Sequence, residues 1–216
     1  MGAILERLND KQVAPLNPRE GINKQSDSSQ FNLSKLSLFD VGSDNWWKQI
    51  ILLGTPLCEV ITTKKVKLTF LWRDYQGCEQ FSKVKAVYVD LNGITDHHQI
   101  PPQSLLRVTG TDVWYWQVEV GADWRGSYTL IPVTEELLPN TEIQHNKTQQ
   151  NKVERRTWWR SIMKRAIPDP FNLQSPRHGH WGNVFSAVHL PRSPDQSAWY
   201  QLDEGITPYA DVSRLS

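Results

Sequence analysis

Cysteine is scarce in this sequence, and long apolar runs are absent. Only two cysteines, Cys58 and Cys78, occur among the 216 residues, which is too few for a disulfide framework, and they lack the clustered spacing of a zinc ribbon. Charged residues interrupt the N-terminal apolar residues too early for a secretory signal, and no apolar run reaches transmembrane length. We therefore expect no membrane partner, and we interpret both cysteines as small buried or half-buried hydrophobic residues.

An excess of charge of one sign is also absent. Lysine and arginine total 24 and the acidic residues total 23, so the chain has no electrostatic footprint for binding a polyphosphate or an anionic membrane. We therefore expect no nucleic-acid partner. A chain of this length is nevertheless long enough to bury one sizeable core.

Aromatic residues, by contrast, are abundant, because the sequence holds ten tryptophans. Such large rings either fill a core or line a surface that grips a flat ligand. Several lie in segments where apolar and polar residues alternate as in a half-buried strand. Polar turns rather than long helices separate these segments, and Pro132 closes the last one; this pattern predicts a mainly β, antiparallel β-sandwich. The predicted strands are residues 66–72, 84–91, 105–108, 113–120 and 127–133.

Two helices accompany these strands. Ser43 has the chemistry of an N-cap for a short helix that carries Trp46 and Trp47, and we expect this tryptophan pair to dock the helix on a sheet. A second helix is predicted after the strands, because Asn151 and Glu154 resemble a capping box followed by apolar residues at helical spacing.

These elements divide the chain into five parts. A Pro-, Asn- and Ser-rich start cannot bury enough apolar surface to offset the entropy of ordering, and a polar stretch follows the last predicted strand. After the second helix, frequent prolines predict an extended segment that lies over the sandwich. The parts are a flexible N-terminal tail (1–41), the β-sandwich (42–135), a polar loop (136–152), the helix (153–167) and the extended segment (168–216).

Several of these segments, in matching order, resemble the N-terminal domain of the enterochelin (enterobactin) esterase family. The most specific are residues 110–116 (GTDVWYW) and 122–128 (ADWRGSY). The resemblance extends over residues 42–194 or so. The other matching segments are 66–74 (VKLTFLWRD), 92–99 (NGITDHHQ), 102–107 (PQSLLR), 131–132 (IP), 169–172 (DPFN) and 186–187 (SA).

The resemblance implies an immunoglobulin-like, early-set β-sandwich with a short N-terminal helix, placed before an α/β-hydrolase domain. In that family the hydrolase serine attacks the ester bonds of a cyclic trilactone that carries catecholate-bound ferric iron. This chain contains no Gly-x-Ser-x-Gly nucleophile motif, so we expect no catalytic residue in it and no esterase activity from it alone. The implied role is an accessory domain that shapes substrate access or packs on a hydrolase domain.

Partners and location also follow from the resemblance. The implied partners are a ferric catecholate siderophore and an α/β-hydrolase domain, in cis or in trans. Ferric iron is expected only as part of the siderophore substrate, with no cofactor bound directly and no metal site in the chain. The implied location is the cytoplasm, where hydrolysis of the siderophore releases its iron.

Arg125 is the first candidate substrate-binding residue. A guanidinium combines positive charge with planar stacking, which suits an anionic catecholate complex. The favoured alternative for Arg125 is an ion pair with Asp123 or Asp112 that holds a corner of the sandwich. The adjacent Gly126 predicts a tight backbone approach at this point.

Aromatic residues near Arg125 supply two more candidates. Trp72, Trp114 and Trp116 alternate with polar or outward positions, and we assign them to the core. Tyr115 and Trp124 are then the candidates for an exposed aromatic contact with the substrate.

Histidines form two further groups. His97 and His98 follow Asp96, but neighbours on a strand point to opposite faces, so one metal site cannot easily use both. We expect Asp96 and one histidine to hydrogen-bond a loop, and we keep His97 and His98 as candidates that face a hydrolase cleft. His178 and His180 have a spacing that zinc accepts, but a solvent-facing loop is the favoured interpretation.

Two alternatives stay open beside the accessory domain. A carbohydrate-binding β-sandwich module would use exposed, coplanar tryptophans to stack on sugar faces. An independent metalloenzyme would require His97, His98, His178 and His180 to converge beside carboxylates.

Overall fold

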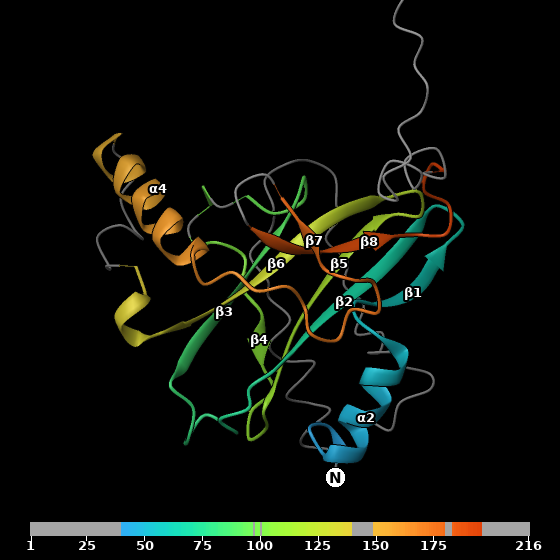
Figure 1. Cartoon of the computed structure of the whole chain (residues 1–216), viewed down its shortest axis with the longest axis horizontal. Helices are drawn as coiled ribbons and strands as arrows, with labels where there is room; N and C mark the ends of the chain where they lie inside the picture. The colour runs from blue at the N-terminus through green and yellow to red at the C-terminus, as the bar shows by residue number, and fades with distance from the viewer. Residues whose placement is uncertain (1–39, 97, 100, 140–148, 180–182, 196–216) are drawn as a thin grey trace, which may run out of the picture.

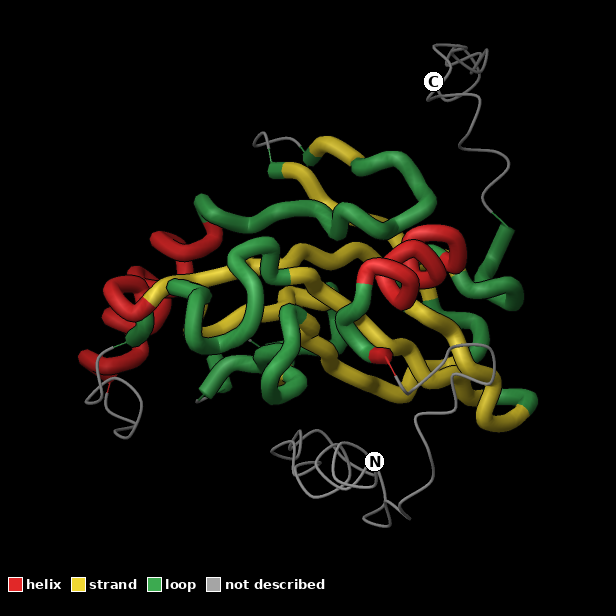
Figure 2. The backbone as a smooth tube through the Cα atoms, turned by 90° about the horizontal axis from the view of Figure 1, so that it is seen from below, coloured by secondary structure: helices red, strands yellow, loops and turns green. Residues whose placement is uncertain are grey.

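The computed structural model describes residues 40–96, 98–99, 101–139, 149–179 and 183–195. Two antiparallel sheets of four strands each form the body of the protein, and two helices lie at its opposite ends (Figures 1 and 2). The prediction of a mainly β sandwich is therefore confirmed, while its immunoglobulin-like character stays a prediction. Among the described helices, none is both long and apolar enough to cross a membrane.

The first sheet consists of β1 (Leu57–Thr62), β2 (Lys65–Arg73), β5 (Val113–Gly121) and β4 (Leu106–Arg107), in that order. β2 and β5 pair along their whole length. Sequence analysis did not predict the edge strand β1, because consecutive exposed residues such as Val60 and Ile61 break the alternation of a half-buried strand. Cys58, also on β1, is exposed, so its assignment as a buried or half-buried residue is wrong, whereas the same assignment is confirmed for Cys78, which is half-buried.

The second sheet consists of β3 (Val84–Leu91), β6 (Arg125–Thr134), β8 (Val184–His189) and β7 (Arg177–His178), in that order. β8 pairs with the first four residues of β6. The sequence predicted that the sandwich ends at residue 135, but β8 and β7 extend it beyond that point. Part of the segment predicted to lie extended over the sandwich is instead a strand within its second sheet.

Pro132 lies inside β6 rather than closing it. It is opposite Val87 of β3, and the strand continues to Thr134. Leu130 donates its N–H to Ile167, on the side away from β3, and residues two apart on a strand present their N–H groups to the same side. The missing N–H of Pro132 thus faces away from β3, beyond the region paired with β8, so proline removes no ladder hydrogen bond.

The main core lies between the two sheets. Phe70 of β2 stacks on Trp116 of β5 with ring centroids 5.5 Å apart, and it meets Tyr128 of β6 edge-on at 4.8 Å. These are favourable geometries for aromatic pairs. Trp72, Trp114 and Trp116 are all buried, which confirms their assignment to the core.

Helix α2 (Asp44–Leu53) covers the outer face of the first sheet. The Ser43 hydroxyl accepts the N–H of Trp46 at 3.1 Å, as an N-cap does. Trp46 and Trp47 are fully buried in a cluster with Tyr115 of β5. The predicted N-cap and the docking by the tryptophan pair are both confirmed.

Helix α4 (Gln149–Met163) follows a short 3₁₀ turn, η2 (Glu135–Leu137), and covers the outer face of the second sheet with Trp159 and Ile162. The predicted bounds of 153–167 are therefore wrong at both ends. Asn151 lies inside the helix, so the predicted capping box is also wrong. The predicted N-terminal tail lies almost wholly outside the described residues.

Candidate functional site

Tyr115 is not the exposed aromatic contact that the sequence predicted. Its side chain is buried beneath α2, in the cluster around Trp46 and Trp47, and burial raises the pKa of its phenol. Alternation on β5 does turn Tyr115 away from the main core, but the sheet face on that side is covered by a helix. Sequence pattern identifies the face and cannot show what covers it.

Trp124 is half-buried and packs against the main core. A Cβ added to Gly126 would lie only 2.4 Å from Cζ2 of the Trp124 ring, so the prediction of a tight approach at Gly126 is confirmed. Trp124 and Arg125 are neighbours at the start of β6, and neighbours on a strand point to opposite faces. The two side chains therefore do not line one site.

Arg125 is exposed at the start of β6, directly opposite His189 of β8. Asp112, one of its two predicted ion-pair partners, instead binds Nε of Arg73 at 2.8 Å and Nε1 of Trp47 at 2.9 Å. Within the part of the chain that the structure describes, Arg125 forms no ion pair. Its guanidinium is thus available to a ligand.

Of the two adjacent candidate histidines, His98 is exposed and His97 lies outside the described residues. Oδ1 of Asp96 accepts the backbone N–H of His98 at 2.9 Å, which orders the loop after β3 and agrees with the loop-holding role expected for Asp96. His180 also lies outside the described residues. In the described ranges, no three metal-ligating side chains converge, and because His97 and His180 lie outside those ranges, the metalloenzyme alternative stays a prediction.

A buried polar cluster around Asp169 holds the backbone just before the segment 172–177 in place. Asp169 is only 3% exposed, and its Oδ2 accepts hydrogen bonds of 2.7 Å from the hydroxyls of Tyr128 and Thr55. Its Oδ1 accepts the N–H of Phe171 at 2.9 Å. Burial raises the pKa of Asp169 despite these hydrogen bonds. Burial, and then the charge of Asp169, raises the pKa of Tyr128 well above its usual value.

Asn172 extends this hydrogen-bond network to β8. Its side-chain amide donates to the hydroxyl of Tyr128 at 3.1 Å and to the carbonyl of Ala187 at 3.0 Å, and its Oδ1 accepts the N–H of Gln174 at 2.8 Å. An asparagine that bonds the backbone two residues on is a common turn device. The segment 172–177 is thereby held beside β8, where it leads into β7.

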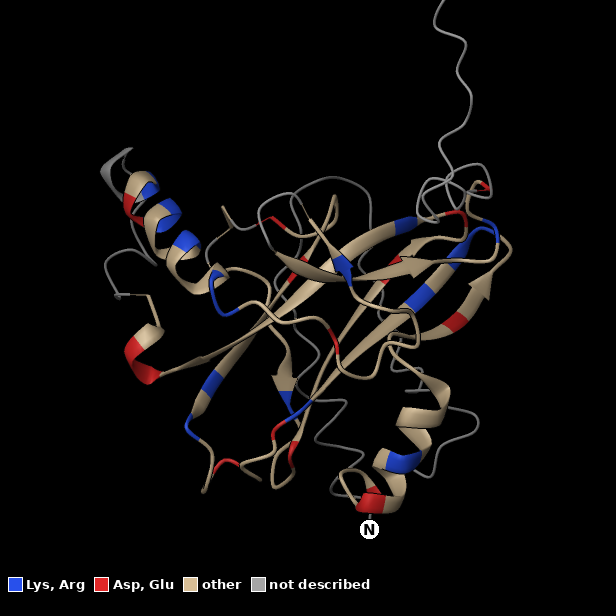
Figure 3. Ribbon diagram, viewed as in Figure 1, with Lys and Arg blue, Asp and Glu red and all other residues tan. Residues whose placement is uncertain are grey.

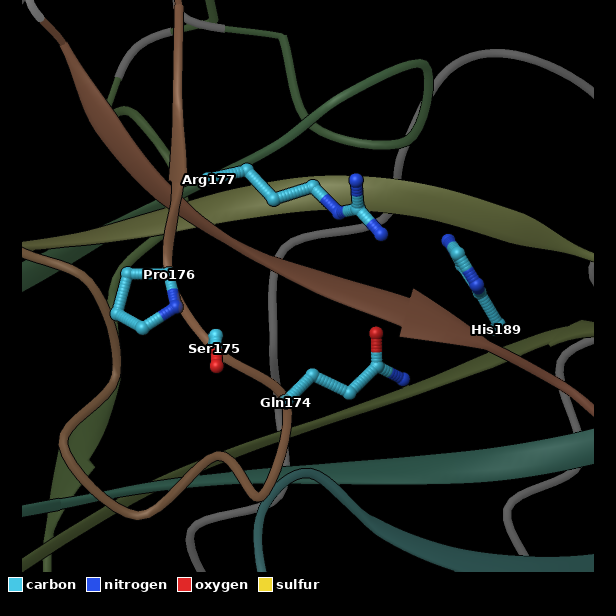
Figure 4. A pocket seen from close by; sticks show the side chains of 5 residues that line it. All are labelled: Gln174, Ser175, Pro176, Arg177 and His189. Carbon is cyan, nitrogen blue, oxygen red and sulfur yellow. The ribbon is translucent and has the colours of Figure 1, made fainter. Parts of the chain in front are cut away.

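A hollow of about 600 Å³ lies between this segment and β8. Figure 4 shows the guanidinium of Arg177 and the imidazole of His189 facing each other, with the amide of Gln174 directed to the same space. Burial lowers the pKa of His189, and the charges of Arg177 and Arg125 lower it further. The residues that line the hollow are Gln174, Ser175, Pro176, Arg177 and His189.

The chemistry of the hollow suits binding rather than bond cleavage. Ser175 and His189 both line it, but within the described structure Ser175 makes no hydrogen bond to His189 that would activate its hydroxyl. Guanidinium, imidazole and amide groups instead supply hydrogen-bond donors. Sequence analysis found Arg125 but missed Arg177 and His189. The short, mostly apolar run 184–189 (VFSAVH) was the available signal for β8.

A second feature is an apolar surface at the end of α2. Ile51, Leu52 and Leu53 are exposed there, Leu52 to 80%, and Leu173 is 72% exposed. A Cβ added to Gly54 would lie 2.4 Å from Cγ of Leu173, so this leucine lies against the end of the helix. We call these four residues the α2 apolar surface. Single exposed aliphatic residues are ordinary, but a contiguous group of them marks an interaction surface.

Tryptophan exposure bears on the carbohydrate-binding alternative. Every tryptophan in the described ranges is buried or half-buried, and Trp181 and Trp199 lie outside those ranges. The close tryptophan pairs, Trp46–Trp47 among them, meet edge-on inside the protein. The described residues thus offer no coplanar, exposed indoles of the kind that sugar binding uses.

Comparison with known proteins agrees with the sequence resemblance. A family model described as "Enterochelin esterase, N-terminal" matches residues 67–199. The iron(III) enterobactin esterase of Dickeya dadantii is 43% identical over 188 residues, which are 87% of this chain and 42% of that protein. The corresponding esterase of Yersinia enterocolitica is 42% identical, over 89% of this chain and 53% of its own length. The chain therefore spans about half the length of these relatives.

Solved structures give the same result. The crystal structure of enterochelin esterase from Shigella flexneri is similar with a TM-score of 0.61 and 39% identity, over 74% of this chain and 38% of that one. The Shigella flexneri enterobactin esterase crystallised in the presence of 2,3-dihydroxy-N-benzoyl-serine is similar with a TM-score of 0.60 and 36% identity, over the same shares.

Proposed function

Because the chain belongs to the enterochelin esterase N-terminal domain family, we propose that it is an accessory domain in the hydrolysis of ferric enterobactin. A hydrolase domain, in cis or in trans, cleaves the ester bonds, and this chain packs on that domain or shapes access of the siderophore to it. Iron then enters only as part of the substrate, and its release takes place in the cytoplasm. The relatives with this activity in their names are about twice the length of the chain.

The α2 apolar surface is the observation that carries this proposal. Leu52 and Leu173, its most exposed members, come from segments more than a hundred residues apart, and Leu173 lies against Gly54, which ends the helix that carries Leu52. Covering exposed aliphatic surface with a partner contributes roughly 25 cal/mol of favourable binding free energy for each Å² buried. This surface adjoins β1, the edge strand of its sheet, so a neighbouring domain has both apolar and backbone groups to contact.

A chimera tests the proposal. This chain replaces the matching N-terminal part of the Dickeya dadantii relative, and kcat/KM for ferric enterobactin is measured. Leu52→Asp and Leu173→Asp are each expected to lower this value several-fold, because a carboxylate placed in an apolar interface must lose its water. Val153→Asp is the matched control, since Val153 is equally an exposed aliphatic residue but lies on α4. Equal kcat/KM values for all three variants and the parent chimera would refute packing through this surface.

A further inference from the structure

Helix α4 and the turn that follows it concentrate positive charge. Residues 149–165 hold six lysines and arginines but a single acidic residue, Glu154, and Figure 3 shows basic residues recurring along the helix. The six are Lys152, Arg155, Arg156, Arg160, Lys164 and Arg165. Because the whole chain has a net charge of only +1, the remainder of the chain is net acidic, and the excess of positive charge lies at the α4 end of the sandwich.

Three of these cations form a row along the exposed side of α4. Lys152, Arg156 and Arg160 are all exposed, and their spacing of four residues makes them successive neighbours over about 12 Å of helix. Within the described ranges, none of the three forms an ion pair. Like charges at this spacing destabilise a helix, whereas opposite charges would stabilise it. We call these three residues the α4 basic row.

Arg155, beside this row, is buried without a counter-ion. It is only 8% exposed and lies one turn before Trp159, which packs α4 on the second sheet. Nε and Nη1 of its guanidinium are buried, and in the described part of the chain no group accepts a hydrogen bond from either and no carboxylate pairs with Arg155. A buried charge without a partner is strongly unfavourable. An anionic group supplied from outside the chain would therefore stabilise this side chain.

The surroundings of α4 indicate which kind of anionic partner fits. A helix surface is convex, whereas small ligands bind in concave sites. Trp159 and Ile162 already face the second sheet, so α4 has no free apolar face with which to enter a membrane surface. The net acidic remainder of the chain would repel an extended polyanion such as a nucleic acid. A local patch of carboxylates on another protein meets all three conditions.

We propose that the α4 basic row and Arg155 bind an acidic surface of a partner protein, one of whose carboxylates pairs with Arg155. Lys152 is a helix neighbour of both Arg155 and Arg156, so a carboxylate that binds beside Lys152 comes next to the buried guanidinium as well. Helices α2 and α4 lie at opposite ends of the sandwich (Figure 1). This contact is therefore separate from the α2 apolar surface and does not depend on the proposed function.

The variant Arg155→Met distinguishes a binding role from a structural one. Methionine has a similar helix propensity and is apolar, so it removes the buried charge and keeps much of the packing. We expect the Tm of the intact chain to rise by about 2 °C or more. Binding of fluorescently labelled poly-L-glutamate, measured by anisotropy, is expected to weaken about tenfold in the same variant. A lower Tm, or unchanged affinity for poly-L-glutamate, would overturn the role of Arg155.

A second comparison tests the α4 basic row. The combined variant Lys152→Gln, Arg156→Gln and Arg160→Gln is expected to weaken binding of poly-L-glutamate about tenfold, with a smaller loss at high salt. The matched control, Lys64→Gln, Lys83→Gln and Lys85→Gln, removes the same charge from exposed positions outside α4 and should change the affinity less than about twofold.

Duplex DNA and vesicles that contain phosphatidylserine are tested at the same ionic strength, to distinguish the kinds of partner. We expect the intact chain to bind poly-L-glutamate in preference to both. Binding of DNA or vesicles without binding of poly-L-glutamate would contradict an acidic protein partner. Equal losses in the two triple variants would show that α4 is not the contact surface, whatever the chimera shows.

Discussion

The hydroxyl of Tyr128 on β6 donates a 2.7 Å hydrogen bond to Oδ2 of Asp169, forty-one residues later in the chain. Both side chains are buried, and Thr55, just before β1, donates to the same oxygen. One carboxyl group thereby links β6 to the segment just before β1, and it fixes the segment that leads to the hollow. No cationic side chain is among the groups that shift the pKa of Asp169, so hydroxyl and N–H groups satisfy its carboxyl.

Removal of this carboxyl should be costly. Asp169→Ala leaves two hydroxyls and the N–H of Phe171 without their acceptor, and each buried unsatisfied group costs about 1–3 kcal/mol. We expect the free energy of unfolding to fall by about 3 kcal/mol or more, measured by urea denaturation. Asp123→Ala, at an exposed position, is the control. A loss no larger than that of the control would mean that the cluster does not stabilise the fold.

Asp169 should also make stability depend on pH. Its pKa in the folded protein is raised above the ordinary value of 3.8 by burial, so the folded state holds this proton more tightly than the unfolded state. The resulting stabilisation is complete below pH 3.8 and is lost as the pH rises through the raised folded pKa. The free energy of unfolding of the wild type relative to Asp169→Asn should therefore increase between about pH 7 and pH 4. A constant difference over this range, or one that decreases toward low pH, contradicts the assignment.

The contact between Gly126 and Trp124 gives a packing prediction. Gly126→Ala places a methyl group 2.4 Å from the indole ring, and overpacking of this kind costs about 1–3 kcal/mol. The displaced indole should also change the intrinsic fluorescence. Combining the change with Trp124→Leu provides room for the methyl group, so the alanine should cost less in that background. Equal costs in both backgrounds would show that the indole is not the obstacle.

Sequence pattern predicted the parts of this fold that have one buried face and one polar face. Strand β3 has the predicted bounds, and β2 and β5 differ from theirs only at the ends. β1 escaped prediction because most of its side chains are exposed at the sheet edge. The strand at residues 184–189 was not predicted, because frequent prolines in this part of the chain indicated an extended segment without strands. Its role as a strand depends on pairing with β6, some sixty residues away in the chain.

The candidate site was predictable only in part for the same reason. The charge and position of Arg125 were visible in the sequence, but its neighbour His189 is placed beside it by strand pairing alone. Alternation also showed that Tyr115 faces away from the main core, while the helix that buries it is specified elsewhere in the chain. The predicted and observed sites therefore differ because sequence pattern shows neither which distant strands pair nor which helix covers a given sheet face.

A buried ion pair beside the β4 strand gives a further stability prediction. Nη2 of Arg107 and the hydroxyl of Ser82 both bind Oδ2 of Asp74, which is 1% exposed. Arg107→Gln leaves a buried carboxylate without its cation, a change that costs about 3–5 kcal/mol. Thermal and urea denaturation should show this loss, whereas Lys85→Gln, at an exposed position, should leave stability within about 0.5 kcal/mol of wild type. A loss below 1 kcal/mol or so for Arg107→Gln would contradict the buried pair.

Hydrolysis of ferric enterobactin, followed by release of catechoyl-serine products, tests the central claim most directly. The purified chain and the chimera with the Dickeya dadantii relative are assayed side by side at equal concentrations. The account predicts turnover by the chimera and none above the buffer rate by the chain alone, which has no Gly-x-Ser-x-Gly motif. Turnover by the chain alone would contradict its role as an accessory domain.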